Sequence, residues 1–128
     1  MNTITVLFVD DNEAFLQSVM RSLPDVPGLD FVPVGYARCG EQAVTMAREL
    51  NPDLVLMDLA MPGIGGLAAT KLIKKASPKI RVVVVSVHTN SEYGIAATSA
   101  GADGFLSKSD FLDRLAPLLQ SLFIGQTA

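Results

Sequence analysis

Near the N-terminus stands Ile4-Thr5-Val6-Leu7-Phe8-Val9-Asp10-Asp11, a short apolar run, rich in β-branched residues, that ends in two carboxylates. Two later runs end in a similar way: Leu54 to Met57 leads into Asp58, and Gly104 to Ser107 leads into Lys108. Short runs of this kind, separated by helical patterns, are typical of buried parallel strands. In an open α/β sheet the C-terminal strand ends face one crevice, where ligands bind. We therefore expect three carboxylates and one ammonium group to converge at that edge.

The segments between these runs carry helical periodicity bounded by turn signals. They predict α/β architecture in the order βαβαβαβαβα, a doubly wound parallel sheet with helices on both faces. The run from Phe31 to Ala37 contains Pro33, which cannot donate to a strand ladder, so this strand should lie at an edge. Thr89-Asn90-Ser91-Glu92 has the spacing of a capping box and should open the fourth helix. Pro117 lies inside the last helical pattern, where we expect a kink or a delayed start.

Length and composition bound the class of protein. The 128 residues predict one domain, 1–128, which is long enough to bury a sizeable core. No apolar stretch approaches the roughly 20 residues of a membrane helix, and no signal peptide is visible. A net charge of −3 argues against nucleic acid as a direct partner. The single cysteine, Cys39, excludes an intramolecular disulfide and predicts a cytoplasmic location; we interpret it as a small buried residue rather than a redox centre.

The converging carboxylates have chemical consequences. Three carboxylates in a low-dielectric cleft repel one another unless a cation joins them, so a divalent metal is implied. Taken singly, Asp10-Asp11 could equally be a pair that caps the first helix, Asp58 a loop residue and Lys108 a solvated lysine. Because these residues all lie at the same end of three predicted strands, a shared binding site is the favoured interpretation. Ser86, at the end of a fourth predicted strand, brings a hydroxyl group to the same edge.

These residues resemble the receiver domain of two-component response regulators. Asp10-Asp11, the stretch Asp58-Leu59-Ala60-Met61-Pro62-Gly63, Ser86 and Lys108 match that family's signature in order and spacing, and the resemblance covers essentially the whole chain. The segments 86–88 and 100–108 particularly resemble receivers that precede a LuxR-type helix-turn-helix output domain. The resemblance implies a flavodoxin-like fold with strand order 2-1-3-4-5, in which the strand that contains Pro33 lies at the edge.

The resemblance also implies a chemistry. Asp58 would accept a phosphoryl group from a phosphohistidine on a sensor histidine kinase, and Lys108 would offset the charge of the transferring phosphoryl oxygens. Asp11, Asp58 and the backbone carbonyl of Ala60 would hold Mg²⁺, with Asp10 contributing directly or through water. The domain would be a phosphoacceptor regulator that catalyses only its own phosphotransfer and slow autodephosphorylation, rather than an enzyme with a separate substrate.

The same resemblance assigns a switch to Ser86 and Phe105. Ser86 would move toward the phosphoryl group and Phe105 would turn inward behind it, which would reshape the surface of the fourth and fifth helices. That surface would control a homodimer, a protein partner or a transcriptional output domain. Simple core packing is the alternative interpretation of Phe105. Ala60 and His88 stand where the family tunes water access to the acyl phosphate, although His88 could also be an exposed loop residue.

Two other functions compete with the switch. A phosphatase with an aspartyl nucleophile would use Mg²⁺ on a related fold, but it typically carries a second Asp two residues after the nucleophile, where this chain has Ala60. An unphosphorylated interaction module of the same fold usually loses an acidic residue or the lysine, and all of them are present here. A basic patch around the third predicted helix is interpreted as a solvated face.

Overall fold

The computed structural model describes residues 2–59, 63–87 and 91–124, and in these ranges five parallel strands form a sheet in the order β2-β1-β3-β4-β5. The strands are β1 (Asn2–Val9), β2 (Leu29–Ala37), β3 (Leu54–Asp58), β4 (Arg81–Ser86) and β5 (Gly104–Ser107). The helices are α1 (Glu13–Ser22), α2 (Gly40–Leu50), α3 (Gly65–Ala76), α4 (Ser91–Ser99) and α5 (Phe111–Phe123), with a short 3₁₀ turn at Leu23–Asp25. The predicted flavodoxin-like fold and strand order are confirmed.

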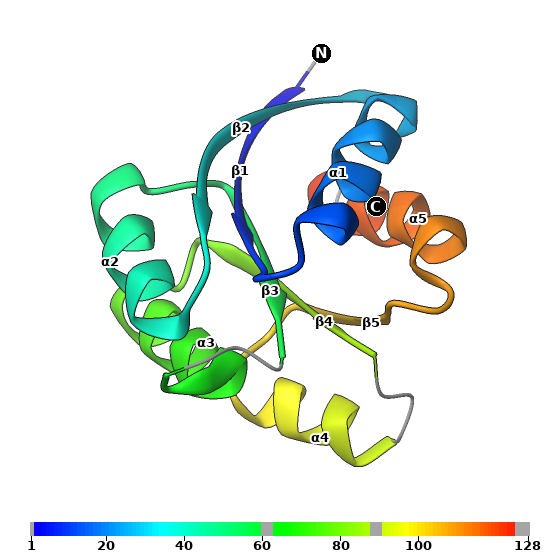
Figure 1. Ribbon diagram of the computed structural model, residues 1–128. Coiled ribbons are helices and arrows are strands. Elements are labelled where there is room, and N and C mark those ends of the chain that lie inside the picture. Colours follow the sequence, from blue (N-terminus) through cyan, green and yellow to red (C-terminus); the bar gives the residue numbers. More distant parts are fainter. Residues whose placement is uncertain (1, 60–62, 88–90, 125–128) are drawn as a thin grey trace.

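The sheet has a hydrophobic core on each face. Helices α1 and α5 cover one face, while α2, α3 and α4 lie on the other (Figure 1). Along β1 the side chains alternate: Val6 and Phe8 enter the core under α1 and α5, and Leu7 and Val9 enter the opposite core. A strand that is buried on both faces needs apolar residues at every position, which is why the first run of the sequence is continuous.

Strand β2 lies at the edge, as its proline predicted. It pairs with β1, and the register shifts between Val6 and Leu7, which face Pro33 and Gly35 respectively, so that Val34 is left over as a bulge. Proline has no backbone N–H to donate. An edge strand tolerates this, because only one of its sides pairs with another strand. The edge position of β2 therefore places β1 and β3 side by side in the middle of the sheet, where the first and third strand ends meet.

The helices largely keep their predicted bounds, with one exception. Helix α5 begins at Phe111 and runs through Pro117 to Phe123, so the delayed start expected at the proline is wrong. Because Pro117 has no N–H, the carbonyl of Asp113 lacks its usual partner in the helix. Both residues lie on the exposed side of α5, where water can bind that carbonyl. The first two residues of the predicted capping box, Thr89 and Asn90, lie outside the described residues. Of the described helices, none has the length and apolarity needed to cross a membrane.

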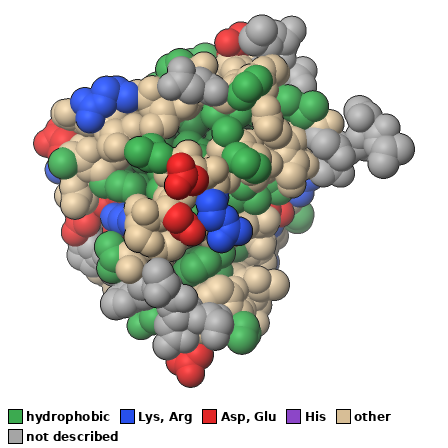
Figure 2. All heavy atoms as spheres, turned by 90° about the vertical axis from the view of Figure 1, so that its right-hand side faces the viewer, with side chains coloured by type: hydrophobic (Ala, Val, Ile, Leu, Met, Phe, Trp, Pro, Cys, Tyr) green, Lys and Arg blue, Asp and Glu red, His purple; other side chains and the backbone are tan. Residues whose placement is uncertain are grey.

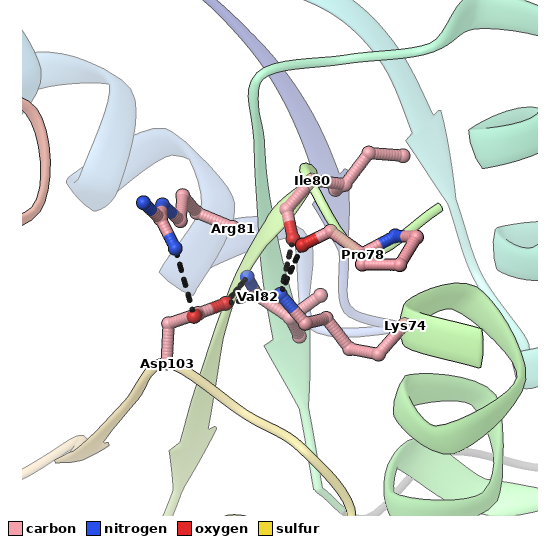
Figure 3. Close-up of polar contacts among 6 residues, drawn as sticks. All are labelled: Lys74, Pro78, Ile80, Arg81, Val82 and Asp103. Atoms are coloured by element: carbon pink, nitrogen blue, oxygen red, sulfur yellow. Dashed lines mark hydrogen bonds and ion pairs between the residues drawn. The ribbon is translucent and has the colours of Figure 1, made fainter. Parts of the chain in front are cut away.

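An ionic cluster ties together the end of the sheet opposite to the converging strand ends. Asp103, just before β5, accepts from Lys74 Nζ at the end of α3 (2.9 Å), from Arg81 Nη1 at the start of β4 (3.3 Å) and from the backbone N–H of Val82 (2.9 Å). Lys74 Nζ also donates to the carbonyls of Pro78 and Ile80 (Figure 3). The cluster fixes the start of β5 against β4. It thereby helps to fix the position of Lys108, which follows the other end of β5.

Candidate functional site

Asp10 lies directly after β1 and is almost fully buried. Its backbone N–H donates to the carbonyl of Ala37 at the end of β2 (3.1 Å). Its Oδ1 atom accepts from the backbone N–H of Asn12 (2.8 Å), and its Oδ2 atom accepts from Lys108 Nζ (2.9 Å). Both carboxylate oxygens therefore have donors, which offsets the cost of placing this group in the interior.

Asn12, and not the acidic pair, caps the first helix. Its side-chain oxygen accepts from the backbone N–H of Phe15 (3.1 Å), the bond expected of an N-cap residue. The alternative interpretation of Asp10-Asp11 as the cap is therefore wrong. Asp11 is exposed, and its carboxylate is not used in that cap, so it is available to the cleft.

Asp58 is the last residue of β3, and only 6% of its surface is exposed. The chain leaves the sheet immediately after it: Leu59 N–H donates to the carbonyl of Val85 (2.9 Å), and Gly66 N–H donates to the carbonyl of Leu59 (3.1 Å). A Cβ atom on Gly66 would lie within 3.0 Å of the Asp58 backbone, closer than real side chains approach. A glycine is thus required where α3 begins against the site.

The three acidic residues come together as predicted. Each of Asp10, Asp11 and Asp58 offers a carboxylate oxygen, and these oxygens lie within 4.8 Å of one another. Hard divalent cations prefer oxygen ligands of this kind, and Mg²⁺ keeps several waters beside one or two carboxylates. Two buried carboxylates and one exposed carboxylate meet that requirement, because the exposed side leaves room for water. The donor set of this cleft therefore fits a magnesium ion.

Lys108, after β5, brings the expected ammonium group to the carboxylates. Its Nζ atom lies 2.9 Å from Asp10 Oδ2 and 3.8 Å from Asp58 Oδ1, and 14% of its side chain is exposed. Its backbone N–H donates to the carbonyl of Ser86 (2.7 Å), which joins the end of β5 to that of β4. The interpretation of Lys108 as a solvated lysine is wrong, because its side chain is largely enclosed and ion-paired.

Ser86 and Phe105, the residues of the expected switch, lie on the neighbouring strands β4 and β5. Ser86 ends β4 and is buried, with 1% of its surface exposed. Phe105 is half-buried on β5 and packs against the core under α2, α3 and α4. A Cβ atom on Gly94 of α4 would lie 3.8 Å from its ring, so Phe105 lies against that helix. The carbonyl of Ala60 and the side chain of His88 lie outside the described residues.

The two helices that contact β5, the strand of Phe105, each carry an exposed apolar residue. Ile95 on α4 and Leu112 on α5 are 67% and 61% exposed, and both helices contact β5. The other apolar residues of α5 pack inward: Leu119 is fully buried, while Leu118, Leu122 and Phe123 lie against the core. Ile95 and Leu112 are therefore the large apolar side chains that stay exposed on the described parts of α4 and α5.

Charges on the molecular surface are few and mixed where they can be seen. Figure 2 shows a face on which acidic and basic side chains lie side by side near the centre, among hydrophobic and uncharged atoms. The described part of this face carries no broad basic patch.

One residue of the site was not foreseen. Phe15 lies on the apolar side of α1, where it packs against the core. The structure places Lys108 Nζ over its ring, 4.3 Å from the centroid. The sequence gives no signal of this contact, because it depends on where the loop after β5 places Lys108 in space.

Comparison with known proteins supplies the family. The family model described as the response regulator receiver domain matches residues 6–120. The chain is 42% identical over 123 residues to response regulator GacA of Pseudomonas aeruginosa, in an alignment that covers 96% of this chain and 56% of that protein. It is 39% identical, with the same coverage, to response regulator UvrY of Escherichia coli. The chain thus spans little more than half the length of these relatives.

The solved structures agree with this fold. A crystal structure of a two-component response regulator of the LuxR family from an Aurantimonas species superposes with a TM-score of 0.85 at 30% sequence identity. The match covers 96% of this chain and 86% of that one.

Proposed function

This chain belongs to the response regulator receiver domain family, and from that membership we propose that it is a phosphorylation-dependent signalling switch with Asp58 as its phosphoryl acceptor. Members of this family are regulators in two-component signalling rather than enzymes. One observation carries the proposal: the carboxylates of Asp10, Asp11 and Asp58 lie within 4.8 Å of one another, with the Lys108 ammonium beside two of them.

Asp58 is the best placed of the three carboxylates to be the acceptor. It is buried at the end of a central strand, and Lys108 Nζ lies 3.8 Å from its Oδ1 atom, close but not in hydrogen-bond contact. Asp10 accepts from the backbone N–H of Asn12 and from Lys108 Nζ, which suits it to hold the ammonium beside the acceptor. In the proposed transfer an Asp58 oxygen attacks the phosphorus of a phosphohistidine on a cognate sensor histidine kinase, and the bond from phosphorus to the imidazole nitrogen breaks.

Asp10, Asp11 and Asp58, with the backbone carbonyl of Ala60, would hold Mg²⁺, which when bound supplies positive charge beside the phosphoryl oxygens. The Lys108 ammonium, which follows β5 at the same edge of the sheet, supplies a second positive charge. Ser86 would donate its hydroxyl hydrogen to the acyl phosphate once it has formed. Burial of the acceptor limits the access of water, which favours a phosphoryl group that lasts long enough to signal.

Output would pass through the surface around α4 and α5. Movement of Ser86 toward the phosphoryl group would free space behind it for the Phe105 ring, which now lies against α4. The exposed Ile95 of α4 and Leu112 of α5 would then change their presentation to a partner, a second copy or an output domain that controls transcription. The relatives are longer than this chain, so an output domain belongs to this proposal.

The test is phosphorylation by a small donor. The protein is incubated with Mg²⁺ and acetyl phosphate, and intact mass is followed for one added phosphoryl group. We expect Asp58→Asn to remain unlabelled, while the matched variant Asp30→Asn, changed at an exposed residue of β2, is labelled like the wild type. Full labelling of Asp58→Asn would refute the assignment. Transfer from a purified phosphorylated histidine kinase would then identify the partner.

A further inference from the structure

We propose that Phe15 is a positioning residue for Lys108, holding its ammonium group in the cleft by a cation–π contact. The inference rests on the proposed function for its consequence, because the ammonium matters chiefly for phosphoryl transfer. Its structural part stands independently: Lys108 Nζ lies over the face of the Phe15 ring, 4.3 Å from the centroid, well inside the roughly 6 Å range of such contacts.

The ring completes the surroundings of the ammonium. Lys108 Nζ has Asp10 Oδ2 at 2.9 Å, Asp58 Oδ1 at 3.8 Å and the Phe15 ring on a further side. Only 14% of the lysine side chain is exposed, so little water competes for the ammonium. Cation–π attraction is stronger when the cation is desolvated, so this contact belongs to the stronger part of the range.

The Phe15 ring attracts the ammonium without carrying a net charge and without accepting its N–H groups in the way that the two carboxylates do. Asp10 and Asp58 belong to the proposed metal and phosphoryl sites, so their negative charge is shared with other cations when the site is in use. An aromatic ring carries no charge to share and no oxygen to offer a metal. Phe15 can therefore keep the ammonium in place while leaving its N–H groups available to a phosphoryl oxygen.

The ring is itself held in place. Phe15 packs edge-to-face against Phe111, with ring centroids 5.1 Å apart and an interplanar angle of 69°. Phe111 is buried and lies three residues after Lys108, so the loop that carries the lysine also anchors the ring beneath it. Both rings line a small cavity together with Asp10 and Asp58, which places them directly behind the carboxylates.

The first test is spectroscopic and needs neither metal nor phosphodonor. Protons held over the face of an aromatic ring resonate upfield, so the ε-methylene protons of Lys108 should lie upfield of those of the other lysines. The resonance is assigned by its loss in Lys108→Met. We expect the upfield shift to vanish in Phe15→Leu and to persist in Phe15→Tyr. An unshifted Lys108 resonance in the wild type would overturn the proposal.

The second test measures the rate of phosphorylation by acetyl phosphate. Phe15→Leu should slow labelling about fivefold to tenfold, whereas Phe15→Tyr should stay within about twofold of the wild type, because it keeps the ring. The matched control is Phe31→Leu, which removes a ring that packs on the same core far from the cleft. Thermal melts of all variants separate loss of fold from loss of rate.

A double-mutant cycle separates positioning from packing. If Phe15 acts through the lysine, Phe15→Leu should cause no further slowing in a Lys108→Met background. Equal slowing in both backgrounds, or failure of Phe15→Tyr to restore the rate, would show that the ring serves packing only. If even the wild type takes up no phosphoryl group, the proposed function fails, and the spectroscopic test alone decides whether Phe15 places the ammonium.

Discussion

The ammonium group of Lys108 lies closest to Asp10, at 2.9 Å, and forms a longer ion pair, at 3.8 Å, with Asp58, the proposed phosphoryl acceptor. The closer pairing joins the ends of β1 and β5, which are not neighbours in the sheet, across the ends of β3 and β4. In the structure described here the lysine thus balances one carboxylate of a crowded acidic cleft. On phosphorylation the same ammonium has only a short distance to travel to reach an oxygen on Asp58.

The pairing predicts that Lys108→Met lowers stability when no divalent cation is present. The change leaves the buried Asp10 carboxylate without its cationic partner, which costs about 2 kcal/mol for a largely buried pair. Urea unfolding in EDTA measures the loss of free energy, and Lys71→Met on the exposed side of α3 is the matched control. Addition of Mg²⁺ should restore most of the difference. Equal stability of the two variants would mean that the pair is not formed in solution.

A second prediction concerns Asp11, the exposed member of the acidic cluster. Because like charges repel, Asp11→Asn should raise the free energy of unfolding in EDTA by about 0.5–1 kcal/mol. The wild type should gain thermal stability as Mg²⁺ is added, since a ligand that binds the folded state stabilises it. The variant should gain little. Asp30→Asn, which changes an exposed carboxylate of β2, should respond to Mg²⁺ as the wild type does.

Two glycines make a matched pair for a third prediction. Gly66→Ala would force a Cβ atom against the backbone of Asp58 and within 2.9 Å of Leu59 Cα, so it should cost about 1–3 kcal/mol and slow phosphorylation. Gly94→Ala in α4 meets only Phe105, at an ordinary 3.8 Å, and should gain about 0.5–1 kcal/mol. Chemical unfolding and acetyl phosphate labelling measure both variants. A Gly66→Ala protein with wild-type stability and rate would contradict the close approach.

Asp103 gives a prediction in which stability and function separate. Asp103→Ala removes the carboxylate that is paired with the largely buried Lys74, which keeps its two carbonyl acceptors, and it takes the acceptor from the Val82 N–H; the cost should be about 2 kcal/mol. For a domain of this size the melting temperature should fall by roughly 5–10 °C. The cluster lies at the opposite end of β5 from Lys108, so labelling of the folded variant should keep the wild-type rate. A large loss of rate at a temperature where the variant is folded would contradict that independence.

Much of the site was predictable because the strands that carry it are buried on both faces. Such strands show as unbroken apolar runs, so the residues that follow Val9, Met57 and Ser107 could be assigned to one edge of the sheet. The edge position of β2 followed from Pro33 for an equally local reason. Where position depends on periodicity and strand ends, the expectations are confirmed.

The features that could not be predicted from the sequence depend on the backbone path of the loops. The sequence Asp10-Asp11-Asn12 offers three possible caps, and only the backbone path shows that Asn12 is the one used. The contact of Phe15 with Lys108 joins residues 93 positions apart and has no periodic signal.

The last prediction concerns self-association. If phosphorylation changes the surface around α4 and α5, the beryllofluoride mimic with Mg²⁺ should raise the sedimenting mass or shift resonances of that surface. Ile95 is 67% exposed at its centre, so Ile95→Glu should abolish association without affecting labelling. Leu72→Glu, which changes an exposed leucine of α3, is the matched control and should associate normally. If Ile95→Glu still associates, the interface lies elsewhere. If neither mass nor resonances respond to the mimic, the domain is a constitutive binding module rather than a switch.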